Sequence, residues 1–525
     1  MSRHSDRSAY YICHEGILED PTPLSSGCPV TGNAQATGAS RSTEPRFKFG
    51  RMFPGLKPCT DEKFDKEVVA ELMALATAIM SQADDDGNDS DIPAGYTYLG
   101  QFIAHEVTFD KTKEPLDTDD PAPNLRSPQV DLDSLYGRGP AHAGDRRFYQ
   151  DIARLKVGET IAGPSLRKTF FNDLPRSGYG SQRIGKALIP DARNDENLAV
   201  AQTHLAFIKF HNKVVDAVYL SGVPARQLFE TAKKDVVQHF QWIILKDFLP
   251  KLLHKQAAEV LETGVPKFFK PDPECGLFMP LEFSVAAFRF GHSMVRDKYE
   301  WNFMQTSELD PKHPRPATIQ NLFRFTGFSG DLHDKPRLES EWVIDWRRFF
   351  NLTDSGFPDD QRLSNKARKI DTKFSLRLET IPGFPLVTKD LAQQSIAARN
   401  LLRGLARRLP SAEDVAEAIG IKKEDRLTQA QIGIDSPHLT GHTPLWYYIL
   451  KEAELNNGKL GPLASVIIAE TLVGLIAQSP HSIVNDKSFR PKYGPRAEEE
   501  IFEMADLLAF AEVVDPVGQH MGPRL

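Results

Sequence analysis

The segment Tyr98–Asp110 carries an amide and an imidazole at helical spacing. Gln101 and His105 are four residues apart, and this spacing puts two side chains on one face of an α-helix. The rest of the segment is largely apolar, so a buried polar pair there needs hydrogen-bond partners. Taken alone, the pattern favours a core histidine bonded to a neighbour over an acid–base group.

A second segment, 127–137, carries side-chain oxygens at alternate positions: Ser127, Gln129, Asp131 and Asp133. In an extended loop, alternate side chains and the carbonyls between them can converge on a hard cation such as Ca²⁺, which takes about six to eight oxygen ligands. Glu106, next to His105, would add a carboxylate. The alternative is a solvated acidic loop, and the glycine and final glutamate of an EF-hand are missing.

Two segments with helical periodicity carry arginines beside other polar groups. Arg193 stands just before a helix whose first turn holds Asp195 and Glu196. Carboxylates there suit the helix dipole, so capping is their structural interpretation, and a surface ion pair is that of Arg193. Asn400 and Arg403 are three residues apart on a basic helix, which alone indicates a solvated face.

A second histidine lies in an apolar segment. Val285, Phe288 and His292 fall on one face of a helix, and Gly291 leaves room for a flat ligand. A histidine on an apolar helix face is the usual way to hold a haem iron axially. It is also a common way to fill a core, so this segment alone does not decide between the two.

Helices must position these residues. Residues 1–60 are rich in Pro, Gly, Ser and Thr and indicate an irregular arm, and the Asp- and Pro-rich residues 110–140 indicate loop. Strand alternation is scarce. We expect a mainly α fold, a single large helical domain with long loops and little β. Apolar residues recur at helical spacing in 64–80, 96–107, 195–220, 227–249, 281–295, 389–408, 446–454, 462–478 and 497–512.

Composition excludes several classes of function. The 525 residues carry 64 basic and 71 acidic side chains, a net charge of −7, which argues against a nucleic-acid or anionic-membrane surface. No apolar run approaches the roughly 20 residues of a membrane span, and the N-terminus is polar. Four cysteines without a CxxC motif make a disulfide framework or a zinc cluster unexpected. We expect a soluble, cytoplasmic protein, with export by a route without a cleaved signal left open.

In combination, these segments resemble the animal-type haem peroxidases, the peroxidase–cyclooxygenase superfamily that includes myeloperoxidase and lactoperoxidase. GQFIAHE, DLDSLYG and FRFGHS follow one another in the family's order, and the resemblance runs from about Phe49 to near residue 510. It implies an arm at 1–60 and a catalytic domain at 61–525, similar to the compact bacterial branch. The implied activity is reduction of hydrogen peroxide through a ferryl intermediate, with oxidation of small donors such as phenols, halide or thiocyanate.

The resemblance also implies roles for the site residues. His105 would be the distal acid–base group, Arg193 would stabilise developing negative charge, and Gln101 would hold water or peroxide. His292 would be the axial ligand of the iron of haem b, and Asn400 would accept its ring N–H. Arg289 and Arg403 would pair with the haem propionates. The calcium positions would be Glu106, Ser127, Gln129 through its carbonyl, Asp131 and Asp133.

Departures from the family pattern limit these expectations. Ala104 replaces the aspartate that forms one ester to haem in mammalian members, and Asn197 replaces the methionine of the sulfonium bond. Glu196 keeps the second ester position, so at most one covalent link is expected. Glu106 is one methylene longer than the usual aspartate, which puts the calcium affinity in question.

Two other functions stay open from the sequence. A fatty-acid dioxygenase of the same superfamily would need a tyrosine in a helix between the proximal histidine and the Asn400 helix, and residues 317–371 contain no tyrosine. A haem- or calcium-binding protein without turnover would fit better if His105 or Arg193 were missing. The electron donor, the halide preference and the oligomeric state are not encoded in any pattern we find.

Overall fold

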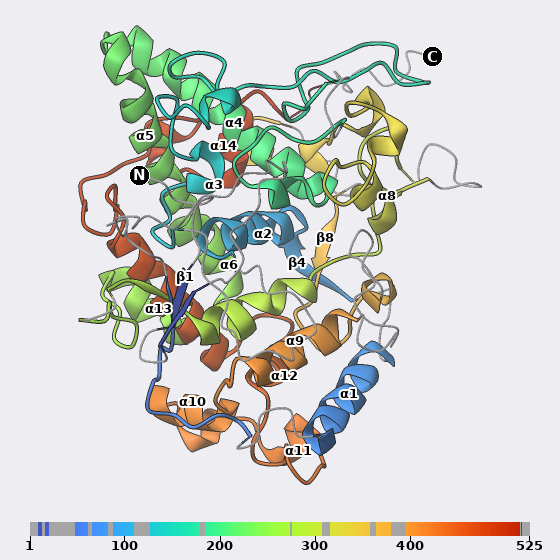
Figure 1. Cartoon of the computed structure of the whole chain (residues 1–525), viewed down its shortest axis with the longest axis vertical. Coiled ribbons are helices and arrows are strands. Elements are labelled where there is room, and N and C mark those ends of the chain that lie inside the picture. The colour runs from blue at the N-terminus through green and yellow to red at the C-terminus, as the bar shows by residue number, and fades with distance from the viewer. Residues whose placement is uncertain are drawn as a thin grey trace, which may run out of the picture.

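The computed structural model describes residues 9–12, 16–19, 48–60, 66–81, 88–109, 127–178, 184–273, 276–306, 315–357, 364–379, 395–514 and 516. Helices dominate this part of the chain, and α2 crosses the middle of the molecule between α4 and α5 above and α9 and α12 below (Figure 1). The sheets described have at most four short strands. The predicted mainly α fold class is confirmed.

The helices agree with most of the predicted periodic stretches. Of these stretches, 389–408 falls partly outside the described residues. The helices are α1 Lys66–Ser81, α2 Gly95–Val107, α3 Asp133–Tyr136, α4 Leu198–Leu220, α5 Leu228–Trp242, α6 Leu249–Leu252, α7 Ala258–Thr263, α8 Ile319–Arg324, α9 Ile396–Ala406, α10 Ala412–Ile419, α11 Gln429–Ile432, α12 Leu445–Leu455, α13 Pro462–Ala477 and α14 Met504–Phe510.

Short strands form three small sheets. The largest has the order β2-β1-β3-β5, from Gly16–Glu19, Ala9–Ile12, Lys48–Gly50 and Phe278–Pro280. Three of these strands lie within residues 1–60, where the sequence predicted irregular structure; most other residues of that arm lie outside the described ranges. The remaining pairs are β4 Asp89–Pro93 with β8 Lys366–Arg368, and β6 Lys298–Tyr299 with β7 Ala317–Thr318.

The start of α2 is fixed by backbone contacts. The N–H of Ala94 donates to the carbonyl of Asn365 at 2.9 Å, and that of Gly95 donates to the carbonyl of Phe349 at 2.8 Å. A Cβ on Gly95 would overlap the ring of Phe350, so this close approach requires glycine. Further along α2, Phe102 stacks on Phe207 of α4 with ring centroids 4.7 Å apart. The helix that carries Gln101 and His105 is therefore held at its start and along its length.

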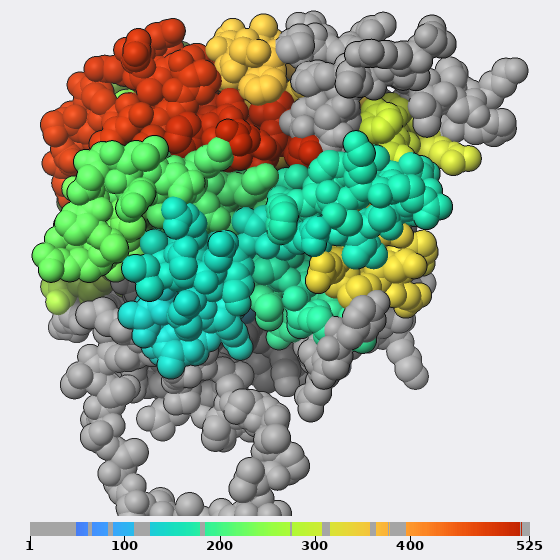
Figure 2. Space-filling model, turned by 90° about the horizontal axis from the view of Figure 1, so that it is seen from above, coloured from blue at the N-terminus to red at the C-terminus, as the bar shows by residue number. Residues whose placement is uncertain are grey.

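Segments distant in the sequence lie side by side at the surface. In Figure 2 the C-terminal segment, in red, lies against the middle of the chain, in green. There Lys492 Nζ contacts Asp235 Oδ1 at 2.8 Å, and the hydroxyl of Tyr493 donates to Asp235 Oδ2 at 2.7 Å. Contacts between elements far apart in the chain therefore help to hold together the helices that surround α2.

The segment 281–295 differs from the predicted single α-helix. Residues Glu282–Ala286 form a π-helical turn, and Ala287–His292 continue as a 3-10 helix. With this change of helix type between Ala286 and Ala287, the α-helical spacing that placed Val285 with Phe288 and His292 no longer applies. The latter two line one cavity, whereas Val285 is buried elsewhere in the core. Similarly, the predicted helix 227–249 passes through a π-helical turn at Ile243–Phe248.

None of the helices in the described ranges is long and apolar enough to cross a lipid bilayer. The most apolar one, α13, is 16 residues long and almost entirely buried in the protein core.

Replacing Gly404 by alanine should stabilise the protein. Gly404 lies in α9, and an added Cβ would meet only Leu409 Cδ1, at the ordinary contact distance of 3.8 Å. Glycine inside a helix costs about 0.5–1 kcal/mol relative to alanine, so we expect a higher midpoint of thermal unfolding. The matched control is Gly95→Ala, which should lower it through the overlap with Phe350. A lower midpoint for Gly404→Ala would contradict this account of α9.

Candidate functional site

Four segments meet around one cavity that encloses about 1600 Å³, part of it open to solvent. They are α2, the turn before α4, the 3-10 segment Ala287–His292, and α9. Of the predicted site residues, the cavity is lined by Gln101, His105, Arg193, Glu196, Arg289, His292 and Arg403. Asn400 stands behind this wall and contacts two of its members, and the predicted calcium residues form a separate cluster beside α2.

His105 is buried, and its ring is held by a hydrogen bond. Its Nδ1 lies 2.9 Å from Oδ1 of Asn194, and its Nε2 lies 4.0 Å from a carboxylate oxygen of Glu196. Because Asn194 presents its carbonyl oxygen, Nδ1 is the protonated nitrogen. Nε2 then has a free electron pair, as a proton acceptor requires.

Arg193 is not the surface ion-pair partner that the sequence alone favours. Its guanidinium binds the buried carboxylate of Asp191 through Nε and Nη2, at 3.1 and 2.7 Å. Nη2 also donates to the carbonyl of His105 at 2.8 Å, and the guanidinium lies 4.1 Å from the ring centroid of Phe109. These contacts hold a fixed positive charge beside the backbone of His105.

The predicted capping role of Asp195 and Glu196 is wrong. Asn197 caps α4, because its Oδ1 accepts from the N–H of Val200 at 3.0 Å, and its amide donates to Gln101 Oε1 at 2.8 Å. Asp195 is instead buried against Arg176, with contacts of 2.7 and 3.0 Å. The dipole argument fails for Asp195 because Arg176 binds its carboxylate, and for Glu196 because its side chain lies in the cavity wall.

Glu196 lies in the cavity wall with its side chain 17% exposed. Burial raises the pKa of its carboxyl to about 7, with the positive charge of Arg193 opposing this rise and the negative charge of Asp191 adding to it. At neutral pH, a substantial fraction of this carboxyl is therefore uncharged. The group is adjacent to Nε2 of His105 and faces the space where a ligand would bind.

The hydrogen bond between His292 and Asn400 has the opposite direction to the one expected from the sequence. The amide Nδ2 of Asn400 lies 3.0 Å from His292 Nδ1 and donates to it, whereas its Oδ1 accepts from Arg289 Nη1 at 3.1 Å. Arg289 turns the amide this way because it occupies the carbonyl oxygen. Burial, with a smaller contribution from Arg289, lowers the pKa of His292 to about 3, so the imidazole is neutral, as metal ligation requires.

Three carboxylates converge beside His105. Oxygens of Glu106, Asp131 and Asp133 lie within 4.8 Å of one another, and all three side chains are buried. Burial and the charges of Asp133 and Asp131 raise the pKa of Glu106 well above its usual range. Such a cluster is unfavourable without a cation, and its all-oxygen chemistry fits a hard ion.

The rest of the predicted calcium loop is only partly convergent. The N–H of Ser127 donates to Asp133 Oδ2 at 3.1 Å. The side chain of Gln129 instead donates to the carbonyl of Gln478 at 3.1 Å, which is compatible with the prediction that only its backbone carbonyl is a ligand. Val130 and Leu132 adopt left-handed backbone angles, with φ of 51° and 57°. This strained alternation turns Asp131 and Asp133 toward Glu106.

Sequence reasoning missed several residues of the site. Asp191 and Asn194 lie beside Arg193 in the sequence, but their partners are set by the fold, so no local pattern reveals them. Arg399 also lines the cavity. It could have been found, because it stands four residues before Arg403 on α9 and shares its helix face.

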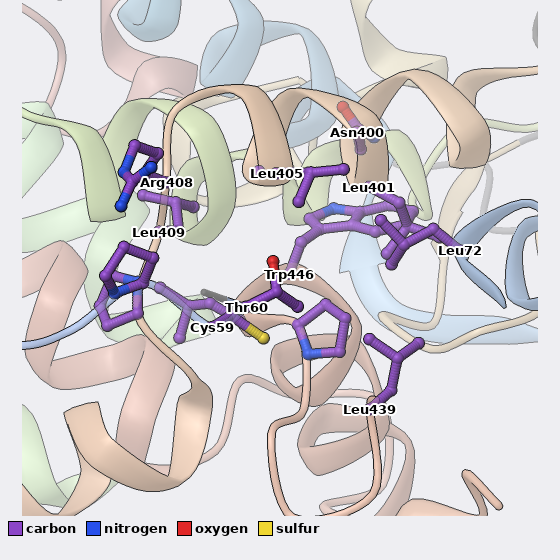
Figure 3. A pocket seen from close by; sticks show the side chains of 15 residues that line it. Cys59, Thr60, Leu72, Asn400, Leu401, Leu405, Arg408, Leu409, Leu439 and Trp446 are labelled. Atoms are coloured by element: carbon purple, nitrogen blue, oxygen red, sulfur yellow. The ribbon is translucent and has the colours of Figure 1, made fainter. Parts of the chain in front are cut away.

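A second cavity, of about 540 Å³, lies on another face of α9 (Figure 3). Leu401, Leu405 and Trp446 line it, so its walls are largely apolar. Cys59 is the thiol there, and burial raises its pKa to about 12. A protonated thiol among leucines offers no nucleophile. The larger cavity, with its charged and titratable side chains, is therefore the candidate site.

The resemblance to the animal haem peroxidases that the sequence motifs predicted is supported by a comparison with family models. The family description "Animal haem peroxidase" matches residues 107–324, a range that includes Arg193 and His292. Haem is the cofactor that this family description names.

Among its curated relatives is thyroid peroxidase of Rattus norvegicus, 23% identical over 364 residues, which are 66% of this chain and 37% of that protein. Heme peroxidase 2 of Caenorhabditis elegans is 24% identical over 357 residues, covering 65% of this chain and 46% of that protein. The alignments therefore span less than half of these relatives' own length.

Solved structures share the fold. Peroxidase A from Dictyostelium discoideum has a TM-score of 0.54 and 15% identity, and the match covers 88% of this chain and 94% of that chain. The fatty acid alpha-dioxygenase of Oryza sativa has a TM-score of 0.51 and 14% identity, with 89% and 81% covered. At this identity, the likeness extends to the fold alone.

Proposed function

We propose that this protein is a haem peroxidase that reduces hydrogen peroxide and oxidises small donors, such as phenols, halide or thiocyanate. The observation that carries the proposal is that one cavity collects His105 and Arg193 together with His292. The first two are a proton acceptor and a fixed cation. The third is a neutral imidazole suited to bind iron. The family match supports the same function.

The residues of the cavity fit haem. Phe248, Phe283 and Phe288 supply apolar walls for a flat ring. Arginines suit carboxylates because of their forked donors, and those available for the propionates are Arg289, Arg399 and Arg403. When bound, haem supplies the redox chemistry, and the protein supplies ligation, orientation and electrostatics.

On the peroxide side, His105 would move a proton. Its Nε2 accepts the proton of the inner peroxide oxygen and returns it to the outer oxygen, so that water leaves. Arg193, fixed by Asp191, stabilises the negative charge that develops as the O–O bond breaks. Gln101 orients water or peroxide through its amide, whose oxygen is already held by Asn197.

On the other side, His292 would hold the haem iron through Nε2. Iron binding there places the ring proton on Nδ1, which needs an acceptor. Asn400 would supply one only with its amide turned, which would require Arg289 to leave the amide oxygen that it now occupies. Such an outer hydrogen bond raises the donor strength of the imidazole. Of the two predicted ester positions, Glu196 alone retains a carboxyl, so at most one covalent link to haem is part of this proposal.

Calcium is the second proposed cofactor, held by Glu106, Asp131 and Asp133 with Ser127 and the Gln129 carbonyl. We expect chelation to lower the thermal unfolding midpoint, and calcium to restore it better than magnesium, which prefers a smaller octahedral site. A bound ion at 100 times its Kd contributes about 2.7 kcal/mol. Differential scanning fluorimetry with and without EDTA measures this. Glu106→Gln should show a smaller shift of the unfolding midpoint on chelation. A midpoint that does not change on chelation, in the wild type as in Glu106→Gln, would contradict a calcium site.

The visible absorption spectrum of haem-loaded protein tests the proposed function. We expect a histidine-ligated ferric band that shifts on one equivalent of hydrogen peroxide and returns on addition of a phenol. A chain that binds no haem would remove the basis of the site assignments. Haem that ignores peroxide but supports oxygen uptake with a fatty acid would identify a dioxygenase instead.

A further inference from the structure

Three buried polar side chains form a row behind the peroxide side of the cavity. His105 Nδ1 lies 2.9 Å from Asn194 Oδ1, and Asn194 Nδ2 lies 2.9 Å from His204 Nδ1. Asn194 and His204 are completely buried. They come from different elements, because Asn194 belongs to the 3-10 turn Ala192–Asp195 and His204 to α4. The row therefore connects α2 to α4 through the turn that carries Arg193.

The amide in the middle gives this row a direction. An asparagine side chain accepts only at its oxygen and donates only at its nitrogen. His204 Nδ1 takes the donated proton, so Asn194 has its oxygen turned toward His105. That oxygen can be satisfied only by a protonated Nδ1. In the opposite tautomer, the proton would sit on Nε2, and His105 could not accept a proton from a molecule in the cavity.

We propose that Asn194 is a positioning residue that holds His105 in the tautomer with Nε2 unprotonated, and that His204 fixes the orientation of the Asn194 amide. The inference rests on the proposed function, because the tautomer matters only if His105 accepts a proton from peroxide. Arg193 has a separate task here: it donates to the backbone carbonyl of His105, whereas Asn194 holds the ring. In a neutral histidine, the hydrogen-bond partner of one ring nitrogen determines whether the other nitrogen carries the proton.

Two substitutions of Asn194 by side chains of nearly equal size separate hydrogen bonding from packing, and a third, at His204, tests what orients the Asn194 amide. Asn194→Leu removes both the acceptor and the donor, whereas Asn194→Asp keeps an acceptor for Nδ1 of His105 and lets His204 donate in turn. His204→Leu leaves Asn194 in place and removes the group that orients its amide. The row of hydrogen bonds predicts the largest change in the His105 tautomer, and in the rate with peroxide, for Asn194→Leu. The change should be smaller for His204→Leu, and Asn194→Asp should be close to the wild type.

The first measurement reads the tautomer without any reaction. Full-length protein labelled in its histidine ring nitrogens and loaded with diamagnetic zinc protoporphyrin is studied by nitrogen NMR, and His105 is assigned by its absence in His105→Gln. We expect a protonated Nδ1 in the wild type and in Asn194→Asp. Asn194→Leu should show a population with the proton on Nε2. An unchanged His105 tautomer in Asn194→Leu would overturn the proposal.

The second measurement is the stopped-flow rate of haem-loaded protein with hydrogen peroxide. Asn194→Leu should react at least about tenfold more slowly, within the roughly 10²–10⁴-fold that a general acid–base group contributes. Its haem affinity and its KM for the donor should not change. Equal losses in Asn194→Leu and Asn194→Asp would point to packing and overturn the proposal. If wild-type haem protein ignored peroxide while the tautomer still shifted, the proposed function would fail and the tautomer assignment would stand.

Discussion

His292→Ala is expected to abolish tight haem binding. The structure holds this imidazole neutral in the cavity wall, with its pKa lowered to about 3. Loss of an outer hydrogen-bond partner alone typically costs about 10–100-fold in metal affinity, so loss of the ligand itself should cost more. Titration of the haem-free variant with haem, followed by the visible absorption band, measures the change in Kd.

Two controls make this result specific to His292. His333→Ala removes a half-exposed histidine that does not line the cavity and should bind haem normally. Added imidazole should enter the space left in His292→Ala and restore a histidine-type absorption band, which also shows that the variant is folded. Tight, histidine-type haem binding by His292→Ala without imidazole would show that another residue is the ligand.

His105→Ala is expected to retain haem and to react with hydrogen peroxide about 10²–10⁴-fold more slowly. The ligand His292 is on another segment of the cavity and keeps its contact with Asn400. The substitution leaves the buried carbonyl oxygen of Asn194 without its donor, which costs about 1–3 kcal/mol of stability. Stopped-flow mixing of haem-loaded protein with peroxide gives the rate, and the visible spectrum gives the haem content.

His105→Gln separates the chemical role from the structural one. A glutamine amide can still donate to Asn194, but it cannot accept a proton at neutral pH. We therefore expect the glutamine variant to be as slow as the alanine variant, with stability closer to that of the wild type. A normal rate with peroxide in either variant would show that His105 is not the proton acceptor.

Much of the site could be predicted from local patterns. The spacing of Gln101 and His105 predicted one helix, and α2 carries both into the same cavity. The alternating oxygens of 127–133 and Glu106 predicted a cation cluster, and three of those carboxylates do converge. These predictions work because the periods of helices and extended loops are short-range properties, and hydrophobic periodicity reports which face is buried.

The ion-pair and hydrogen-bond partners of the site residues could not be predicted from local patterns. Arg193 binds Asp191 next to it, yet the burial of that pair depends on the packing of α2 against α4. The direction of the Asn400 amide follows from Arg289, more than a hundred residues away. Both arrangements depend on which polar groups are buried together once the core has formed. Each buried polar group then needs a hydrogen-bond partner, because a buried group without one lowers the stability of the protein.

The sequence by itself therefore indicated the resemblance to the animal haem peroxidases, the mainly α fold and the side chains that we propose carry the chemistry. The tertiary structure alone decided the pitch of the segment before His292, the capping of α4 by Asn197 and the row from His105 to His204. The physical reason is the distance along the chain over which the two kinds of interaction act. Residue type and spacing fix what a segment can do locally, whereas hydrogen-bond direction and burial depend on residues that only folding brings together.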